Sequence, residues 1–183
     1  MKKLLLLLLS VGIISAAQAQ FGVRAGYSTS NFSDTNFTSK SGFHLGGYYR
    51  YGNGFLSIEP GLQYSQKGYE TQASTSAEVS ERLGYLDIPV LLRLNSVFLP
   101  FLNVFAGPQA SLLLSRNYDL GGITNTSTEV IRGYDIGGVV GVGVGFESGF
   151  NAQLSYDLGF TDLNYFNSNV KNRVLKVSVG FDF

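Results

Sequence analysis

Apolar and polar residues alternate along almost the whole chain after its first twenty residues, and no helical period appears there. The clearest example is the segment 150–160, in which every second residue is apolar and those between are small or polar. Because a β-strand turns successive side chains to opposite faces, such a segment has one apolar wall and one polar wall. Eight segments share this pattern: residues 21–31, 41–51, 55–67, 83–94, 98–114, 132–146, 150–160 and 173–183.

The connections between these segments alternate in length. Tight turns at 52–54, 95–97 and 147–149 separate long polar stretches, which we predict to be loops: residues 29–40, 68–82, 115–131 and 161–172. Outer-membrane barrels have short periplasmic turns and longer extracellular loops, and their strands need ~9–11 residues to cross the bilayer. The sequence therefore predicts an all-β fold, an eight-stranded antiparallel up-and-down transmembrane β-barrel of the small OmpX and OmpA type.

A secreted soluble barrel of the lipocalin kind would also alternate, but with its polar face toward water. Three features favour the membrane barrel. The polar faces are rich in Gly, Ser, Asn and Gln rather than Lys and Glu, which suits a crowded interior. The apolar faces carry no charge along the strand bodies, where a charge at mid-bilayer would cost ~2–4 kcal/mol. Aromatic residues gather at the strand ends, as in the interfacial girdles of membrane barrels.

The first residues have the organisation of a secretory signal peptide. Lys2 and Lys3 precede an apolar run that begins with the leucines 4–9, and small residues lead to Ala17 and Ala19. The run is too short for a membrane helix, which needs ~20 residues, so a retained anchor is the less favoured alternative. We predict a signal peptide over residues 1–19, a barrel domain over 20–183, and a location in the bacterial outer membrane.

Composition excludes several function classes. Without Lys2 and Lys3, the 13 basic residues fall to 11 against 13 acidic ones, so the mature chain has no basic footprint for nucleic acid. It has no cysteine and one histidine, so neither a disulfide nor a thiolate or histidine metal centre is expected. We expect no cofactor.

Charged residues on the polar faces are the only candidates for chemistry. Both signs are present, and because side chains fill the lumen of an eight-stranded barrel, buried charges need partners. If the third and fourth strands fold about a loop centred near residue 76, Glu59 faces Arg93. If the first and eighth strands close the barrel with both termini level, Arg24 lies near Asp182. We interpret the set as a structural network, with a proton or ion path as the alternative: Arg24, His44, Arg50, Glu59, Lys67, Asp87, Arg93, Asp135, Asp157, Lys176 and Asp182.

His44 is a possible catalytic residue, because some outer-membrane barrels are lipid-modifying enzymes that use a His with a Ser and a carboxylate. Such chemistry must face lipid, whereas His44 falls on the inward face, so we expect no enzyme. The glycines within 137–145 alternate with valines on a strand and precede no helix, so they do not form a phosphate-binding loop.

Three prolines fall in the middle of predicted strands: Pro60, Pro89 and Pro108. Proline cannot donate a ladder hydrogen bond and normally avoids closed sheets. We therefore predict β-bulges or local gaps in the ladder at these positions, on adjacent strands.

Two sets of motifs resemble known patterns. The end of the chain, with Phe181 and Phe183, resembles the signal read by the barrel-assembly machinery. Four internal stretches resemble hallmarks of the PorT-like outer-membrane β-barrel family: IEPGLQYSQKG (58–68), YLDIPVLLRL (85–94), FAGPQASLLL (105–114) and YDLGFTDL (156–163). The resemblance spans roughly residues 21–183. It implies the barrel fold and the outer-membrane location, and for the protein that gives the family its name it implies a part in protein secretion.

The expected function is a structural or interaction role exerted through the long outer loops. Outer-membrane lipid, the barrel-assembly machinery and other envelope proteins are the expected partners, and nucleic acid is not. The alternatives are a subunit of a PorT-like secretion machine, a narrow transport barrel and a lipid-active enzyme.

Overall fold

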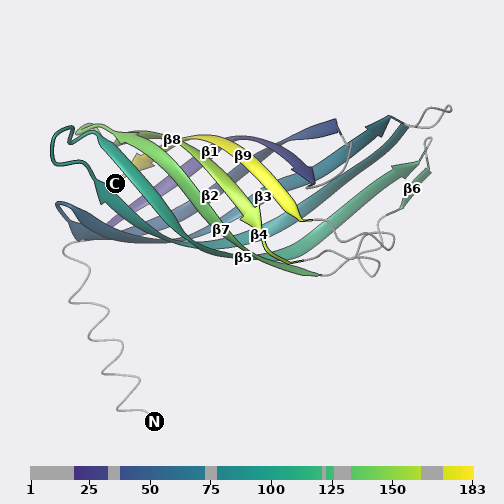
Figure 1. Cartoon of the computed structure of the whole chain (residues 1–183), viewed down its shortest axis with the longest axis horizontal. Coiled ribbons are helices and arrows are strands. Elements are labelled where there is room, and N and C mark those ends of the chain that lie inside the picture. The colour runs from purple at the N-terminus through teal and green to yellow at the C-terminus, as the bar shows by residue number, and fades with distance from the viewer. Residues whose placement is uncertain (1–18, 33–37, 73–77, 121–122, 126–132, 162–170) are drawn as a thin grey trace, which may run out of the picture.

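The computed structural model is a closed antiparallel β-barrel, drawn in Figure 1. It describes residues 19–32, 38–72, 78–120, 123–125, 133–161 and 171–183, so the signal peptide predicted for residues 1–19 lies outside the described residues except for Ala19. The barrel strands are β1 (Ala19–Phe32), β2 (Thr38–Asn53), β3 (Leu56–Gln72), β4 (Glu78–Asn95), β5 (Leu102–Leu120), β7 (Tyr134–Gly145), β8 (Phe150–Gly159) and β9 (Asn172–Asp182). The three-residue strand β6 (Ile123–Asn125) pairs only with the far end of β5. Among the described residues, no helix is long and apolar enough to cross a bilayer.

Each barrel strand pairs with its neighbour in the chain, β5 with β7 included, and the circle closes between β1 and β9. The closing ladder runs from Gly22 opposite Asp182 to Phe32 opposite Asn172. Closure leaves no free edge in the membrane part of the sheet, which is what a sheet in hydrocarbon requires. The predicted eight-stranded up-and-down barrel is confirmed.

The two faces of the sheet carry opposite kinds of residue, as the alternation predicted. Large apolar side chains point outward, for example Leu45, which is 58% exposed, and Val179, which is 63% exposed. Charged and polar side chains point inward, and Asp87 is 0% exposed. A water-soluble barrel would have the reverse arrangement, so this distribution excludes the lipocalin-like alternative.

Several strands are longer than the sequence predicted. Parts of the predicted loops 68–82 and 115–131 are strand, because β3, β4 and β5 continue pairing as far as Gln72 opposite Glu78 and Val79 opposite Leu120. These polar residues lack the alternation that marks a membrane strand, but a backbone ladder in water does not need an apolar face. At the other end β5 begins at Leu102 rather than at residue 98, because residues 96–101 form a turn that Leu102 N closes by donating to Leu99 O.

The prolines interrupt the ladder as predicted. No pairing is present where Pro60 lies opposite Tyr49, where Pro89 lies opposite Gly61, or where Pro108 lies opposite Val90. Each proline lacks a pairing partner on the strand that precedes its own in the chain. The register of the two strands is the same on both sides of the gap. The interruptions are therefore local gaps and not bulges. The register does shift at two other places, between Ser39 and His44 on β2 and between Gly84 and Tyr85 on β4, and neither involves a proline.

The three turns at the chain-terminal end of the barrel differ in character. Two of them use glycines in the left-handed region, such as Gly54 with φ 61° and Gly149 with φ 89°. The β4–β5 turn instead carries Val97, Leu99 and Phe98, whose side chain is 94% exposed. This turn is tied to its neighbours on both sides, because Asn95 N donates to Phe55 O and Gly145 N donates to Phe101 O. It is an ordered apolar projection.

Candidate functional site

Ion pairs divide the charged residues of the lumen into two clusters, stacked along the barrel. The turn-end cluster comprises Arg24, Arg50, Glu59, Arg93 and Asp182. The loop-end cluster comprises Lys67, Asp87, Asp157 and Lys176, with Asp135 beside them. Together with His44 these are the residues that the alternation assigned to the inward face. Each is buried except Arg50 and Asp182, which are half-buried near the turn end.

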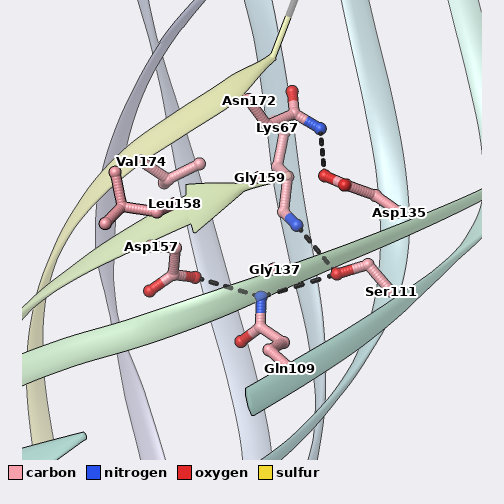
Figure 2. A pocket seen from close by; sticks show the side chains of 10 residues that line it. All are labelled: Lys67, Gln109, Ser111, Asp135, Gly137, Asp157, Leu158, Gly159, Asn172 and Val174. Carbon is pink, nitrogen blue, oxygen red and sulfur yellow. Dashed lines mark hydrogen bonds between the residues drawn. The ribbon is translucent and has the colours of Figure 1, made fainter. Parts of the chain in front are cut away.

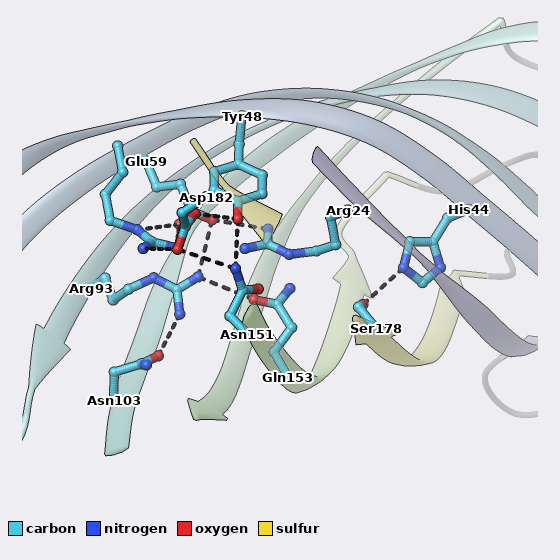
Figure 3. Close-up of polar contacts among 11 residues, drawn as sticks. Arg24, His44, Tyr48, Glu59, Arg93, Asn103, Asn151, Gln153, Ser178 and Asp182 are labelled. Atoms are coloured by element: carbon cyan, nitrogen blue, oxygen red, sulfur yellow. Dashed lines mark hydrogen bonds and ion pairs between the residues drawn. The ribbon is translucent and has the colours of Figure 1, made fainter. Parts of the chain in front are cut away.

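Glu59 on β3 is the centre of the turn-end cluster (Figure 3). Its carboxylate accepts from three guanidinium groups: Arg24 Nη1 at 3.0 Å, Arg50 Nε at 2.9 Å and Arg93 Nη2 at 3.0 Å. These arginines come from β1, β2 and β4, so the carboxylate connects four strands across the lumen. Charge-assisted bonds of this kind are the strong class of protein hydrogen bonds.

A second carboxylate, Asp182 on β9, lies closer to the turns. It accepts from Arg50 Nη1 at 3.0 Å, from Tyr48 Oη at 2.5 Å and from Asn151 Nδ2 at 3.2 Å. Asn151 also donates to Tyr48 Oη at 2.8 Å. The hydrogen-bonded network therefore extends to the strands that close the barrel.

Two arginines of the turn-end cluster lie over aromatic rings. The Arg24 guanidinium lies 4.0 Å from the centroid of the Tyr48 ring, and that of Arg93 lies 4.4 Å from the centroid of Phe105. Arg93 also donates to Asn103 and to Gln153. A guanidinium group within about 6 Å of an aromatic centroid makes a favourable cation–π contact, so each ring adds a second attraction that holds its arginine in place.

Apolar residues in the lumen were missed by the sequence analysis. Phe105 packs with Leu91 and Val139 as a buried apolar cluster beside the arginines. The missed inward residues stand at positions of inward parity, so parity alone would have identified them. Among the described residues they are Tyr48, Leu83, Tyr85, Leu91, Phe105, Val139 and Val174.

Asp87 on β4 is the centre of the loop-end cluster. It accepts from Lys67 Nζ at 3.0 Å and from Lys176 Nζ at 3.1 Å. Two hydroxyls complete its shell, Ser65 Oγ at 2.5 Å and Ser111 Oγ at 2.6 Å. A carboxylate buried this deeply is tolerated only because all of these donors are in place.

Beyond Asp87, towards the loops, the cluster encloses a cavity (Figure 2). Lys176 makes its second ion pair here, with Asp157 at 2.6 Å, and Gln109 Nε2 donates to Asp157 at 3.3 Å. Asp135 accepts from Asn172 Nδ2 at 2.8 Å. The cavity measures about 10 Å³, room for about one water molecule, and one of similar size lies beside Arg24.

His44 lies inside the barrel between the two clusters. Its Nε2 is 2.8 Å from Ser178 Oγ, whereas Nδ1 has no hydrogen-bond partner among the described residues. A hydrolytic triad needs a carboxylate on that second ring nitrogen. The described residues also contain no group of three or more His, Asp or Glu side chains that could hold a metal ion.

The two predicted ion pairs had different outcomes. The pair between Glu59 and Arg93 is confirmed at 3.0 Å, although the two residues lie diagonally across the ladder. The pair between Arg24 and Asp182 is wrong. The closing register places Asp182 opposite Gly22, and Arg24 turns across the Tyr48 ring to reach Glu59.

The end of β9 seals the barrel with aromatic contacts. Phe183 stacks on Phe21 with ring centroids 6.0 Å apart, and Phe181 meets Phe150 edge-on at 5.0 Å. The recognition of Phe181 and Phe183 by the barrel-assembly machinery stays a prediction.

Comparison with solved structures identifies barrels of the same shape. Neisserial surface protein A is 18% identical with a TM-score of 0.62, and the match covers 90% of this chain and 99% of that one. Ail of Yersinia pestis, solved with the heparin analogue sucrose octasulfate, is 14% identical with a TM-score of 0.55, covering 91% and 99%. Ail in a phospholipid bilayer nanodisc is 15% identical with a TM-score of 0.56, covering 90% and 99%. At these identities the likeness shows the fold alone.

Family membership rests on the sequence itself. No curated protein matches the chain. The model of one family, described as the outer membrane protein beta-barrel domain, matches residues 15–165, which is most of the chain. The closed barrel, its apolar outer surface and its charged interior agree with that match. The protein therefore belongs to the outer membrane protein beta-barrel domain family and is a barrel of the bacterial outer membrane.

Proposed function

We propose that this protein is a membrane-anchored scaffold that binds an envelope or extracellular partner through the outer extension of β3, β4 and β5. The observation that carries the proposal is the unequal height of the barrel wall. Pairing between β5 and β7 ends at Leu112 opposite Tyr134, whereas pairing between β4 and β5 continues to Val79 opposite Leu120. At ~3.3 Å per residue, the extra part of β5 adds about 25 Å of strand. Figure 1 shows these strands reaching past the rest of the barrel.

The filled lumen supports a scaffold over a transport barrel. Guanidinium groups stacked on Tyr48 and Phe105 occupy the turn-end half, and the apolar cluster with Leu91 and Val139 lies beside them. A solute would have to separate Glu59 from three arginines, and breaking buried pairs of this kind costs several kcal/mol.

The position of His44 supports a scaffold over a lipid-active enzyme. Its imidazole is buried and bonded to Ser178, and lipid reaches only the opposite face of β2. An acyl chain would have to enter the packed interior to reach it.

A subunit of a PorT-like secretion machine is the second candidate. The feature that favours it is the β4–β5 turn, an ordered and charge-free projection with Phe98 at its tip. Val97, Phe98, Leu99 and Phe101 are all exposed, and contiguous exposed apolar groups can mark interaction sites. In this case the partner would be a periplasmic protein, and the outer extension would be secondary.

Site-specific photo-crosslinking in whole cells distinguishes the two. A photoreactive residue replaces Asn117 on the outer extension, Phe98 on the β4–β5 turn, or Glu147 on the β7–β8 turn, all of them exposed. The scaffold role predicts a discrete adduct from Asn117 and none from Phe98 or Glu147. An adduct from Phe98 alone would overturn it in favour of the secretion subunit, and the native size in mild detergent would then report a large complex.

A further inference from the structure

The β4–β5 turn differs from the two other turns at its end of the barrel, the end that carries the C-terminus in Figure 1. Residues 52–54 (Gly-Asn-Gly) and 147–149 (Glu-Ser-Gly) are small or polar, as expected of turns in water. Residues 97–102 read Val-Phe-Leu-Pro-Phe-Leu and include neither a charged nor a polar side chain. Val97 is 75% exposed and Phe98 is 94% exposed, so the described residues leave the tip of this turn uncovered.

The turn is continuous with the apolar outer surface of the barrel. On one side of it, Asn95 N donates to Phe55 O, and on the other side Gly145 N donates to Phe101 O. Phe55 and Phe146, which follows Gly145, are both exposed. A row of exposed apolar side chains therefore passes from the β2–β3 turn across the β4–β5 turn to the β7–β8 turn.

The height of the turn places it at the membrane surface. The outward positions of β5 are apolar and uncharged from Val104 to Leu114. At about 3.3 Å per residue and a tilt of about 40°, this stretch spans about 25 Å of bilayer, which is the height of the apolar band of an outer-membrane barrel. The turn that precedes Val104 therefore lies at the boundary between acyl chains and headgroups. Short turns of such barrels face the periplasm, so the boundary is that of the inner leaflet.

The backbone of the turn suits this boundary. Ser96 N donates to Leu102 O, and Leu102 N donates to Leu99 O. Leu99 N donates to Ser96 Oγ, and Pro100 has no amide hydrogen to donate. Irregular backbone is costly in lipid when its polar groups are unpaired, so these internal bonds lower the cost of placing the turn against lipid. A turn that is already ordered also loses less conformational freedom on contact.

We propose that the β4–β5 turn is a lipid anchor, which inserts Val97, Phe98 and Leu99 into the inner leaflet of the outer membrane at the level of the ester carbonyls. The partner is the apolar region of a phospholipid monolayer rather than a particular headgroup, because the turn has no charge with which to select one. Apolar side chains are stabilised there by leaving water.

The anchor holds the hairpin whose opposite ends belong to the outer extension, so it fixes the height of that extension above the membrane. The inference does not depend on the scaffold role. It is compatible with that role, under which Phe98 gives no protein adduct.

Tryptophan fluorescence tests the proposal directly, because the chain contains no tryptophan. Phe98→Trp puts a single indole at the exposed tip of the turn, where no packing is disturbed, so the variant should fold. The mature variant is placed in phosphatidylcholine nanodiscs, in which both faces of the bilayer are open to solutes. Lipids brominated near the carbonyl should quench its emission, and acrylamide in the water should quench it about threefold less than a water-exposed indole, as for a side chain within the interface.

Two matched variants set the limits of this measurement. Glu147→Trp, at an exposed position of the polar β7–β8 turn, should be quenched by acrylamide and not by brominated lipid. Val179→Trp, on the outward face of β9, should be quenched by brominated lipid and protected from acrylamide.

Either of two results would overturn the proposal. If acrylamide quenches Phe98→Trp as strongly as Glu147→Trp, the turn lies in water and its apolar surface is left for a periplasmic protein. If the indole is protected from acrylamide but brominated lipid does not quench it, a second copy of the barrel covers the turn.

Discussion

The turn-end and loop-end clusters share a plan, in which one buried carboxylate receives several cations, but they fill the lumen differently. Around Glu59 the cations are arginines, whose planar groups also lie on the rings of Tyr48 and Phe105. Around Asp87 they are lysines, compact charges supplemented by small serine hydroxyls. Arginine therefore contributes both charge and bulk, whereas lysine contributes mainly charge. Each half keeps a cavity of about 10 Å³, and among the described residues the unpaired buried atoms of the charged side chains are guanidinium nitrogens in the turn-end half and oxygens in the loop-end half.

The largest expected effect comes from Glu59→Gln. The change keeps the shape of the side chain but leaves three guanidinium groups around a neutral amide. Breaking a buried pair typically costs about 3–5 kcal/mol, and we expect at least that loss in the free energy of unfolding. Urea unfolding in lipid vesicles, followed by circular dichroism, measures it. A loss below about 1 kcal/mol would show that water already solvates these arginines.

Asp87→Asn should be the next most harmful change. It leaves two buried ammonium groups without their carboxylate, whereas Glu59→Gln leaves three guanidinium groups without theirs. We expect a loss of about 3 kcal/mol in the same assay. Adding Lys67→Met to Asp87→Asn should recover part of that loss, since one unpaired charge is then removed. If the double variant is less stable than Asp87→Asn alone, the ion pair is not what Lys67 contributes.

Arg93→Lys separates charge from bulk. The charge stays near Glu59, but the stacking on Phe105 and the forked contacts to Asn103 and Gln153 are lost. We expect a loss of about 1–2 kcal/mol and a small rise in ion conductance across planar bilayers. The reverse exchange at the other cluster, Lys67→Arg, is the matched control and should not raise conductance. An unchanged stability of Arg93→Lys would contradict the view that arginine bulk seals the turn-end half.

Ser178→Ala should have the smallest effect, about 1 kcal/mol, because it removes one hydrogen bond to His44 between the clusters. The same unfolding assay measures it. A loss as large as that of Glu59→Gln would mean that the two clusters are coupled through this histidine.

The alternation of apolar and polar residues correctly predicted the features that depend only on whether a position faces inward or outward. It identified the strands, their outward apolar faces and the inward charged residues, because a half-buried strand has a strict period of two. It also predicted the pair between Glu59 and Arg93, whose strands form one hairpin, so the register there follows from a single connection. The pair between Arg24 and Asp182 failed because the register of the closing strands depends on the shear of the whole barrel.

The lengths of the strands and the apolar residues that fill the lumen were harder to predict. The outer parts of β3, β4 and β5 are paired, but their sequence is mostly polar and has no period of two that would mark a strand. Phe105 and Leu91 were overlooked because an inward apolar residue was not expected among polar ones. Their role depends on which arginine lies beside them, and that is a property of the assembled barrel.

The diagonal row of ladder gaps at Pro60, Pro89 and Pro108 gives the barrel wall a line of local mechanical weakness. The gaps lie side by side on consecutive strands, since Pro89 faces Gly61 next to Pro60, and Pro108 faces Val90 next to Pro89. Local opening starts where backbone bonds are fewest, so amides along this line should lose deuterium protection before those of the unbroken β7–β8 ladder. The sheet is closed all the way round, but we expect its local opening to be concentrated along this row of gaps.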